Sequence, residues 1–217
     1  MVRLQPGSAR ALAELILGYG LILVVLWTPE SAQRILSPLA FVVTLAIVLA
    51  GGHTREELGF GWRGLVPSLW ILPAAGALTL VGVLLSERAG TFHSLYETSL
   101  GHVAGYFLWT IYQQFLLQDY FLPRMTRVLA NQSTAVLFVV AILFATAHLP
   151  NLVLTAATFV WGLISCTLFR RYHKLYAIGL AQGLLGLCFA VCVPDALNHH
   201  MRVGLGYLQY HATRPTP

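Results

Sequence analysis

Seven apolar segments constrain what this chain can fold into more than any other feature. Each approaches the roughly 17 to 25 residues that a helix needs to cross the hydrocarbon of a bilayer. They cover residues 11–27, 35–50, 65–86, 103–122, 134–150, 152–169 and 175–193. Apolar residues make up 57% of the 217 residues, charged residues only 10%, and the mean hydropathy is +0.72. The sequence therefore predicts an all-α, polytopic integral membrane bundle of about seven helices, with eight as the alternative.

No soluble domain, long linker, low-complexity tract or internal repeat separates these segments. Residues 1–217 are therefore predicted to form a single transmembrane domain. The first apolar run follows Arg3 and Arg10, as in a secretory signal, but it is long, contains Glu14 and lacks a small-residue cleavage site. We expect it to remain as the first helix.

Arginine and lysine are distributed unequally between the loops. With a cytoplasmic N-terminus, nine of them fall on the cytoplasmic side and four on the opposite side. We expect this orientation in a bacterial cytoplasmic membrane, with the C-terminus on the far side. The net charge of +5 then indicates the bilayer as partner and requires no nucleic acid. The nine residues are Arg3, Arg10, Arg55, Arg63, Arg124, Arg127, Arg170, Arg171 and Lys174.

Polar residues interrupt the fourth apolar segment, in the stretch YQQFLLQDYFLPRM. Gln113, Gln114 and Gln118 lie where a polar side chain is costly unless it finds an internal partner, so they predict a functional site. Asp119 has two interpretations. It either lines this site or anchors the helix end, where it would pair with Arg124.

Two further polar positions follow, in FATAHLPN and AIGLAQGLLGLCF. His148 lies four residues after Phe144, and Pro150 disfavours helical conformation at the residue before it. His148 would ligate a metal or accept a proton; alternatively, His148 and Asn151 would satisfy the backbone groups around Pro150. Gln182 is surrounded by glycines, and it is either a site residue or a link between closely packed helices.

Together, these positions resemble the CPBP family of intramembrane endopeptidases, which is related to the CAAX prenyl protease and to bacteriocin-processing (ABI) proteins. That family carries the motifs Glu-Glu-x-x-x-Arg, Phe-x-x-x-His and His-x-x-x-Asn or Asp on successive membrane helices. Phe144 and His148 match the second motif residue for residue. The resemblance extends from about Arg55 to Val193 and is strongest in residues 100–193.

The other two motifs match in order and spacing but not in residue type. In the first motif, Gln113 and Gln114 stand where the family has its glutamates, and Gln118 stands where it has its arginine. In the third motif, Gln182 replaces the histidine and Gly186 replaces the final Asn or Asp. In the family, a glutamate is thought to activate the attacking water, while histidines bind a metal or stabilise the oxyanion. An amide has no accessible basic form, so we expect the family fold without its hydrolytic mechanism.

Three functions remain open at this stage. The first is a CPBP-type endopeptidase using a nonstandard acid, with His148, Gln113, Gln114, Gln182, Asn151 and Asp119 as the candidate catalytic residues. The second is a noncatalytic protein that binds a membrane-associated peptide or an isoprenoid-like lipid. The third is a membrane enzyme acting on a hydrophobic lipid. For a divalent metal, His148 is the best candidate ligand, although the surrounding neutral oxygens are poor ligands for zinc.

The remaining acids and histidines have ordinary interpretations beside the functional ones. Glu56 and Glu57 precede the third segment, where Thr54 and Glu57 fit a helix-opening capping box. In the tail, Asp195 and His199 are spaced four apart, as on one helix face. With nearby histidines they would bind a metal or shuttle protons, or they are solvated interface anchors. The nearby histidines are His200, His211 and His102.

Overall fold

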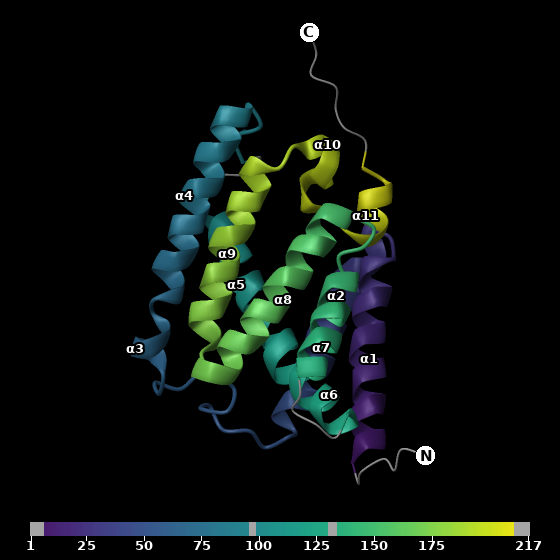
Figure 1. The fold of residues 1–217 in the computed structure, drawn as a ribbon. Coiled ribbons are helices and arrows are strands. Elements are labelled where there is room, and N and C mark those ends of the chain that lie inside the picture. Colours follow the sequence, from purple (N-terminus) through teal and green to yellow (C-terminus); the bar gives the residue numbers. More distant parts are fainter. Residues whose placement is uncertain (1–6, 96–98, 130–133, 211–217) are drawn as a thin grey trace.

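The computed structural model of the protein describes residues 7–95, 99–129 and 134–210. These residues form helices joined by turns and contain no strand (Figure 1). In chain order the elements are α1 (Ser8–Leu26), α2 (Glu30–Leu49), α3 (Leu65–Ser68), α4 (Ile71–Ala89), α5 (Leu100–Phe115), the π-helical turn η1 (Leu116–Phe121), α6 (Leu122–Val128), α7 (Thr134–Thr146), α8 (Leu152–Tyr172), α9 (Leu175–Cys192), α10 (Asp195–Asn198), the 3₁₀ turn η2 (His199–Met201) and α11 (Gly204–Leu208).

Five helical segments of the described chain are long and apolar enough to cross a membrane: α1, α2, the α3–α4 pair, α8 and α9. Large apolar side chains on them are exposed, including Ile35 at 74% and Leu78 at 62%. Such surface is stable against lipid tails and unfavourable in water. The chain is therefore an all-α protein with membrane-spanning helices, as the sequence predicts.

The other two predicted spans differ in form. The helix α5 continues through η1 into α6 without a break from Leu100 to Val128, and α7 is apolar but only 13 residues long. The prediction that the segment 134–150 is helical throughout is wrong, because α7 ends at Thr146 and residues 147–150 form a turn. Pro150 explains the early end, since it disfavours helical conformation at Leu149.

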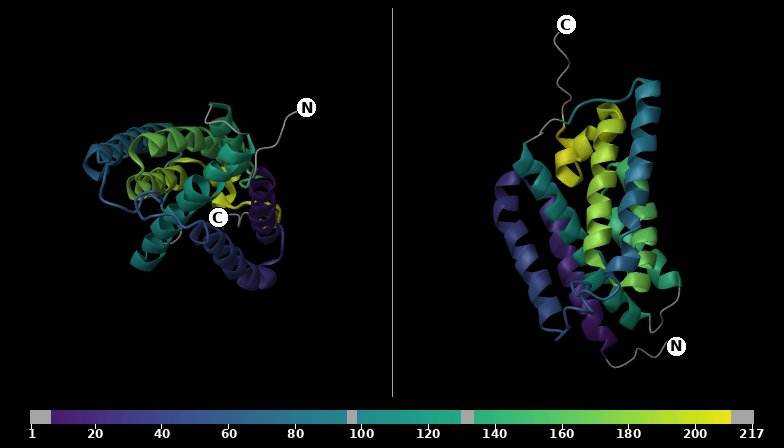
Figure 2. Two further views of the ribbon diagram at one scale, coloured as in Figure 1. Left: turned by 90° about the horizontal axis from the view of Figure 1, so that it is seen from below. Right: turned by 90° about the vertical axis from the view of Figure 1, so that its left-hand side faces the viewer.

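The helices form two groups that meet along α5, η1 and α6. On one side α9 packs against both α4 and α5, and α7 packs along α8; on the other, α1 packs against α2 and α6 (Figures 1 and 2). Gly179 of α9 permits a close approach to α5, since an added Cβ would lie 2.9 Å from the Cα of Ile111. The Thr110 hydroxyl donates to the Gly179 carbonyl at 2.9 Å in the same contact.

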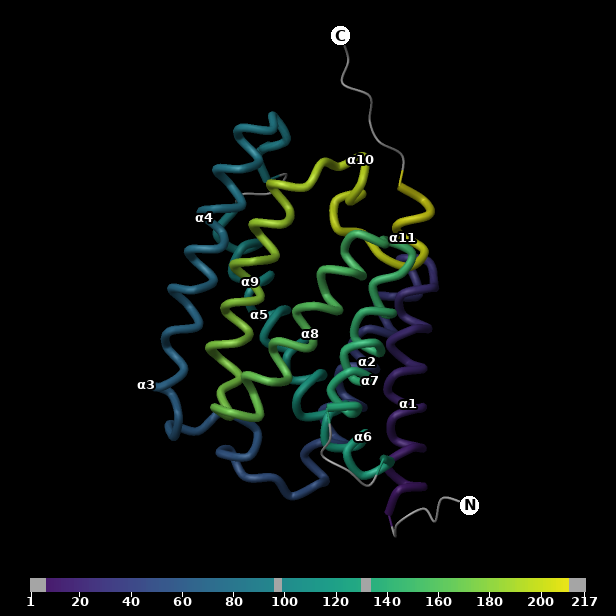
Figure 3. Tube along the Cα trace, viewed as in Figure 1, coloured from purple at the N-terminus to yellow at the C-terminus, as the bar shows by residue number. Residues whose placement is uncertain are grey.

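The two ends of the bundle carry different segments. The helix α1 begins at the lower end, and α11 lies at the upper end (Figure 1). The segment between α2 and α3 crosses the lower end and is fixed to the α8–α9 turn (Figure 3). There the Leu175 amide donates to the Gly59 carbonyl at 3.2 Å, and the buried Lys174 ammonium donates to the Gly61 carbonyl at 2.5 Å.

Candidate functional site

Three of the glutamines meet where α5 faces α9. The Gln182 carbonyl oxygen accepts hydrogen bonds from Gln114 Nε2 and, at 3.0 Å, from the indole Nε1 of Trp161 on α8. Gln182 Nε2 in turn donates to Gln113 Oε1 at 2.5 Å. Trp161 was not among the predicted residues, because a tryptophan in an apolar segment is ordinarily a packing residue.

Trp161 sets the direction of the hydrogen bonds in a series of side-chain amides, the amide relay, which is formed by Gln118, Gln114, Gln182 and Gln113. An indole N–H only donates, so the Gln182 atom facing it is the carbonyl oxygen, and the Gln182 nitrogen faces Gln113. Gln114 also accepts, from Gln118 Nε2 at 3.0 Å. Gln114 and Gln182 therefore each accept from one neighbouring amide and donate to the next. The series ends at Gln113 Nε2, which has no hydrogen-bond acceptor among the described residues.

Gln118 begins the relay from the π-helical turn. Its side chain is 1% exposed, and Nε2 also lies 3.4 Å from the Ser165 hydroxyl of α8. Its carbonyl oxygen is buried with no hydrogen-bond partner in the described part of the chain. A π turn inserts an extra residue into the helix and redirects the side chains around it, a feature that recurs at functional sites.

The relay forms part of the wall of a cavity of about 540 Å³ between α1, α2, α5, α7, α8 and α9. Gln113, His148 and Gln182 line it, together with Phe144 and Gly186. Gln114 lies behind this wall and reaches the cavity only through Gln182. The other lining side chains are mainly aliphatic and aromatic, and none of the described lining residues is Asp, Glu, Lys or Arg.

One ring nitrogen of His148 bonds to the backbone of the preceding turn. Its Nδ1 lies 2.8 Å from the Phe144 carbonyl oxygen, and since that oxygen only accepts, Nδ1 carries the proton in the neutral ring. Nε2 is then the basic nitrogen. The ring also packs edge-on against Phe144, with centroids 5.1 Å apart. The Phe144–His148 contact expected from the sequence thus forms, but a turn rather than a continuous helix holds it.

Asn151 is fully buried and serves the backbone rather than the cavity. Its Oδ1 accepts from the Leu154 amide at 3.1 Å and caps α8, while Nδ2 donates to the Asn198 carbonyl at 2.7 Å. It is not among the residues that line the cavity. Of the two expectations for Asn151, the one in which it satisfies backbone groups is therefore confirmed. Its hydrogen bond to the Asn198 carbonyl links the start of α8 to the tail.

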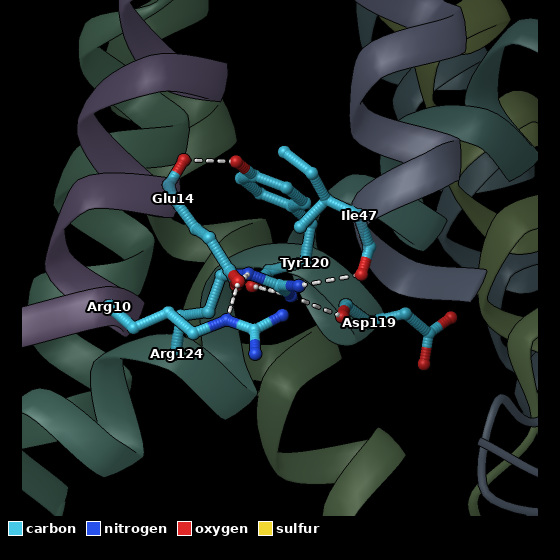
Figure 4. A network of polar contacts seen from close by, with 6 residues as sticks. All are labelled: Arg10, Glu14, Ile47, Asp119, Tyr120 and Arg124. Atoms are coloured by element: carbon cyan, nitrogen blue, oxygen red, sulfur yellow. Dashed lines mark hydrogen bonds and ion pairs between the residues drawn. The ribbon is translucent and has the colours of Figure 1, made fainter. Parts of the chain in front are cut away.

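Asp119 lies apart from the relay. Its side chain is 3% exposed, does not line the cavity, and has a carboxylate oxygen, Oδ2, without a hydrogen-bond partner among the described residues. The predicted pairing with Arg124 is wrong: of Asp119, the Arg124 guanidinium contacts the backbone carbonyl, to which it donates at 3.2 Å, and the carboxylate points away (Figure 4). The reason is a competing acid on α1.

That acid is Glu14, whose carboxylate accepts from Arg124 Nε at 2.8 Å and from Arg10 Nε at 2.8 Å (Figure 4). Arg124 is 4% exposed, stacks over the Tyr120 ring at 4.3 Å, and donates to the Tyr120 carbonyl at 3.0 Å. The Tyr120 hydroxyl donates to the Glu14 backbone carbonyl. An acid inside the first apolar segment was the sequence signal for this network, which joins α1 to α6.

The glutamate pair of the α2–α3 segment does not line the cavity either. Thr54 and Glu57 form the predicted capping-box hydrogen bonds, with the Thr54 amide donating to Glu57 Oε2 at 2.7 Å and the Glu57 amide to the Thr54 hydroxyl at 3.3 Å. They close a turn rather than open the third span, which begins at Leu65. Glu56 lies 3.9 Å from the buried Lys174 ammonium.

The tail acid pairs with a different histidine from the one expected. The helix α10 ends at Asn198, so His199 does not share a helix face with Asp195 and instead stacks on Tyr207 at 4.0 Å. Asp195 Oδ2 lies 2.8 Å from His200 Nε2, and Oδ1 lies 3.9 Å from Nε2 of His93, which sequence reasoning missed. His102 contacts Ser99 near the start of α5, and His211 lies outside the described residues.

The described part of the chain contains no group of three or more His, Cys, Asp and Glu side chains arranged to hold a metal ion. Among the described residues around the relay, His148 is the one side chain that binds metals strongly, and the Gln182 and Gln113 carbonyl oxygens already accept hydrogen bonds. This donor set does not fit a catalytic zinc ion, which takes three protein ligands of the His, Asp, Glu or Cys type. Comparisons with protein-family models, curated proteins and solved structures find no match for this chain.

Proposed function

We propose that this chain is a CPBP-like intramembrane protein whose cavity binds a hydrophobic ligand without hydrolysing it. The amide relay carries the proposal, because its members occupy the positions of the family's two glutamates and third-motif histidine. Gln114 and Gln182 are saturated by each other, by Gln118 and by Trp161. Neither has a basic form that would take a proton from an attacking water.

The cavity supports binding independently of the resemblance. Its volume of about 540 Å³ lies within the range of small-molecule sites, and its lining is mostly apolar with a few convergent polar groups. Among the described lining residues His148 carries the one imidazole, and the nearest acid in sequence, Asp119, does not line the cavity. The described part of that wall therefore has neither a carboxylate base nor a charged electrophile.

The proposal includes seven membrane crossings, with α5–η1–α6 and α7 added to the five long helices. The N-terminal end is cytoplasmic and the C-terminal end faces the other side of a bacterial cytoplasmic membrane. Support comes from the nine-to-four charge bias and from the start of α1 and α11 lying at opposite ends of the bundle, which an odd number of crossings requires (Figure 1).

Hydrolysis is tested with the purified protein in lipid nanodiscs and a fluorogenic farnesylated peptide. We expect no cleavage by the unaltered chain. Cleavage that survives His148→Ala would refute the placement of the site. Cleavage lost in both His148→Ala and Asp119→Asn would instead make Asp119 a general base and the protein an enzyme.

Restoring the family residues is the complementary experiment. The variant carries Gln113→Glu, Gln114→Glu, Gln118→Arg, Gln182→His and Gly186→Asn. If the substitutions alone disabled a protease, this variant gains zinc affinity or cleaves the farnesylated peptide. Gly186→Asn also requires Tyr106 to move, because an added Cβ would meet its hydroxyl oxygen at 2.0 Å. Tyr106→Phe in the same background is therefore a useful companion.

Binding is tested by filling the cavity. Ala157 of α8 lines it, whereas the neighbouring Ala156 is exposed on the outside of the bundle. Ala157→Phe should abolish a lipid adduct in the native mass spectrum of the detergent-purified protein, and Ala156→Phe should retain it. Equal retention in both variants would show that the adduct sits on the outer surface.

A further inference from the structure

We infer that the cavity selects an uncharged lipid with one compact polar group, bound through the free amide nitrogen of Gln113. This inference rests on the proposed binding function and names its ligand class. It starts from the direction of the relay, in which Trp161 orients Gln182 and Gln182 orients Gln113. The carbonyl oxygen of Gln113 is thereby occupied, and its NH₂ group remains as a donor on the cavity wall.

This donor is stronger than an isolated amide. Gln118 donates to Gln114, Gln114 to Gln182, and Gln182 to Gln113, so the dipoles of successive amides add in one direction. Hydrogen bonds in such a chain polarise one another, most effectively in a low-dielectric interior. The Gln113 NH₂ therefore favours a carbonyl, ester, amide or hydroxyl oxygen on the ligand.

One further polar contact available to the ligand is an acceptor. His148 lines the same cavity, and its Nδ1 proton is committed to the Phe144 carbonyl, which leaves the lone pair of Nε2. A ligand group that both accepts and donates, such as a primary amide or a hydroxyl, matches these two atoms. A purely apolar ligand would leave the Gln113 donor without a partner.

Charge decides against ionic headgroups. The described lining contains no Lys or Arg to pair with a phosphate and no Asp or Glu to pair with an amine. An unpaired charge in this environment costs far more than a neutral polar group that is hydrogen-bonded.

The helical wall of the cavity decides against a peptide. A stretch of extended peptide brings one N–H and one C=O per residue, and each unsatisfied group is costly in a water-free site. Ser37, Tyr106 and Trp109 add only single polar side-chain groups to those of Gln113 and His148. The described chain has no strand whose edge would pair with an extended backbone, so these separate side chains suit a compact polar group and not a peptide.

The route of entry agrees with a lipid. Trp109 of α5 and Val160 of α8 line the cavity and are still 50% and 55% exposed. Both lie away from the ends of their helices, so the proposed membrane crossings place them at the depth of the hydrocarbon. The cavity thus opens toward lipid tails, from which a long-chain amphiphile enters without crossing water.

The experiment measures how much tritiated oleamide the full chain retains in nanodiscs. The amount retained by Ala157→Phe in the same nanodiscs is subtracted as background, and unlabelled competitors are then added. Unlabelled oleamide and oleyl alcohol should displace the label, and oleyl phosphate and oleylamine should need at least tenfold higher concentrations. Gln113→Leu should weaken oleamide binding about tenfold, the effect of losing one good hydrogen bond. The matched control is Gln209→Leu, at an exposed position after α11, which should bind as the unaltered chain does.

The outcomes separate this inference from the function on which it rests. Equal competition by oleyl phosphate, or full binding by Gln113→Leu, overturns the selectivity while leaving a ligand-binding cavity. Retention that is the same in Ala157→Phe and in the unaltered chain overturns the cavity as a binding site. Displacement by a hydrophobic peptide at the concentration effective for oleyl alcohol would identify a peptide as the preferred occupant and overturn the inference.

Discussion

Glu14 and Arg124, 110 residues apart in the sequence, form an ion pair with an Nε–Oε2 distance of 2.8 Å that fastens α1 to α6. Arg124 is 4% exposed on its side chain and Glu14 16%, so water screens this pair little. The second partner of Glu14, Arg10, is bonded at the same distance but is 76% exposed. The two arginines therefore provide a matched test of burial.

Arg124→Met should destabilise the protein by about 3 to 5 kcal/mol, because it leaves the Glu14 carboxylate without its buried partner. Arg10→Met should cost less than about 1 kcal/mol, as for an exposed ion pair. Unfolding by SDS titration from mixed micelles measures both. Equal losses in the two variants would contradict the burial argument.

Gln182→Leu should destabilise the bundle by about 2 kcal/mol. Three partners lose a hydrogen bond, Gln113, Gln114 and Trp161, and interhelical hydrogen bonds in membranes average about 0.6 kcal/mol. Gln182→Glu keeps the acceptor for Gln114 and Trp161, so it should lose the Gln113 contact while leaving the Trp161 hydrogen bond. Trp161 fluorescence in the two variants distinguishes these effects, and identical spectra would argue against the relay.

Gly204 and Gly206 of α11 should respond differently to the same substitution. At Gly204 the φ angle is +55° and an added Cβ would lie 2.1 Å from the Leu26 carbonyl oxygen, whereas nothing lies within 4 Å of a Cβ at Gly206. Gly204→Ala should cost more than about 1 kcal/mol, and Gly206→Ala should be neutral or stabilising. Thermal unfolding in detergent measures the difference. Equal effects would show that α11 does not pack against the end of α1.

The turn closed by Thr54 and Glu57 should depend on pH. The hydrogen bond from the Thr54 backbone amide, followed by that from its hydroxyl, lowers the pKa of the Glu57 carboxyl. A lowered pKa means that this carboxylate stabilises the fold above its unfolded pKa, and that the contribution is lost as the pH falls through the folded value.

Stability of the unaltered chain and of Glu57→Gln should therefore differ at pH 7 and converge as the pH falls below the unfolded pKa of about 4.3 and through the lowered folded pKa. The comparison uses thermal unfolding in detergent across this range. A difference that persists unchanged at pH 3 would show that the carboxylate charge is not involved.

The sequence determined the class of fold and the ranges of the apolar segments, because both depend on local properties. A helix must carry enough consecutive apolar residues to match the bilayer, and a Pro must end or bend it near its own position. Four of the expected segments agree with helices of the structure to within about three residues. The second helix begins earlier, at Glu30, the fourth continues further, to Val128, and the fifth ends early, at Thr146. Even the capping pair Thr54 and Glu57 was visible, since its partners are three residues apart.

Tertiary structure decided which polar groups meet. The glutamines at 113, 114 and 182 were each visible as polar residues in apolar helices, but only the packing of α5 on α9 made them partners, and only Trp161 gave their hydrogen bonds a direction. Arg124 has Asp119 five residues away and nevertheless pairs with Glu14, because the turn of the helix points Asp119 elsewhere and α1 brings an acid to its side. Sequence spacing determines which face of a helix a side chain lies on. The packing of the helices determines which residue, from a distant part of the chain, lies opposite that face.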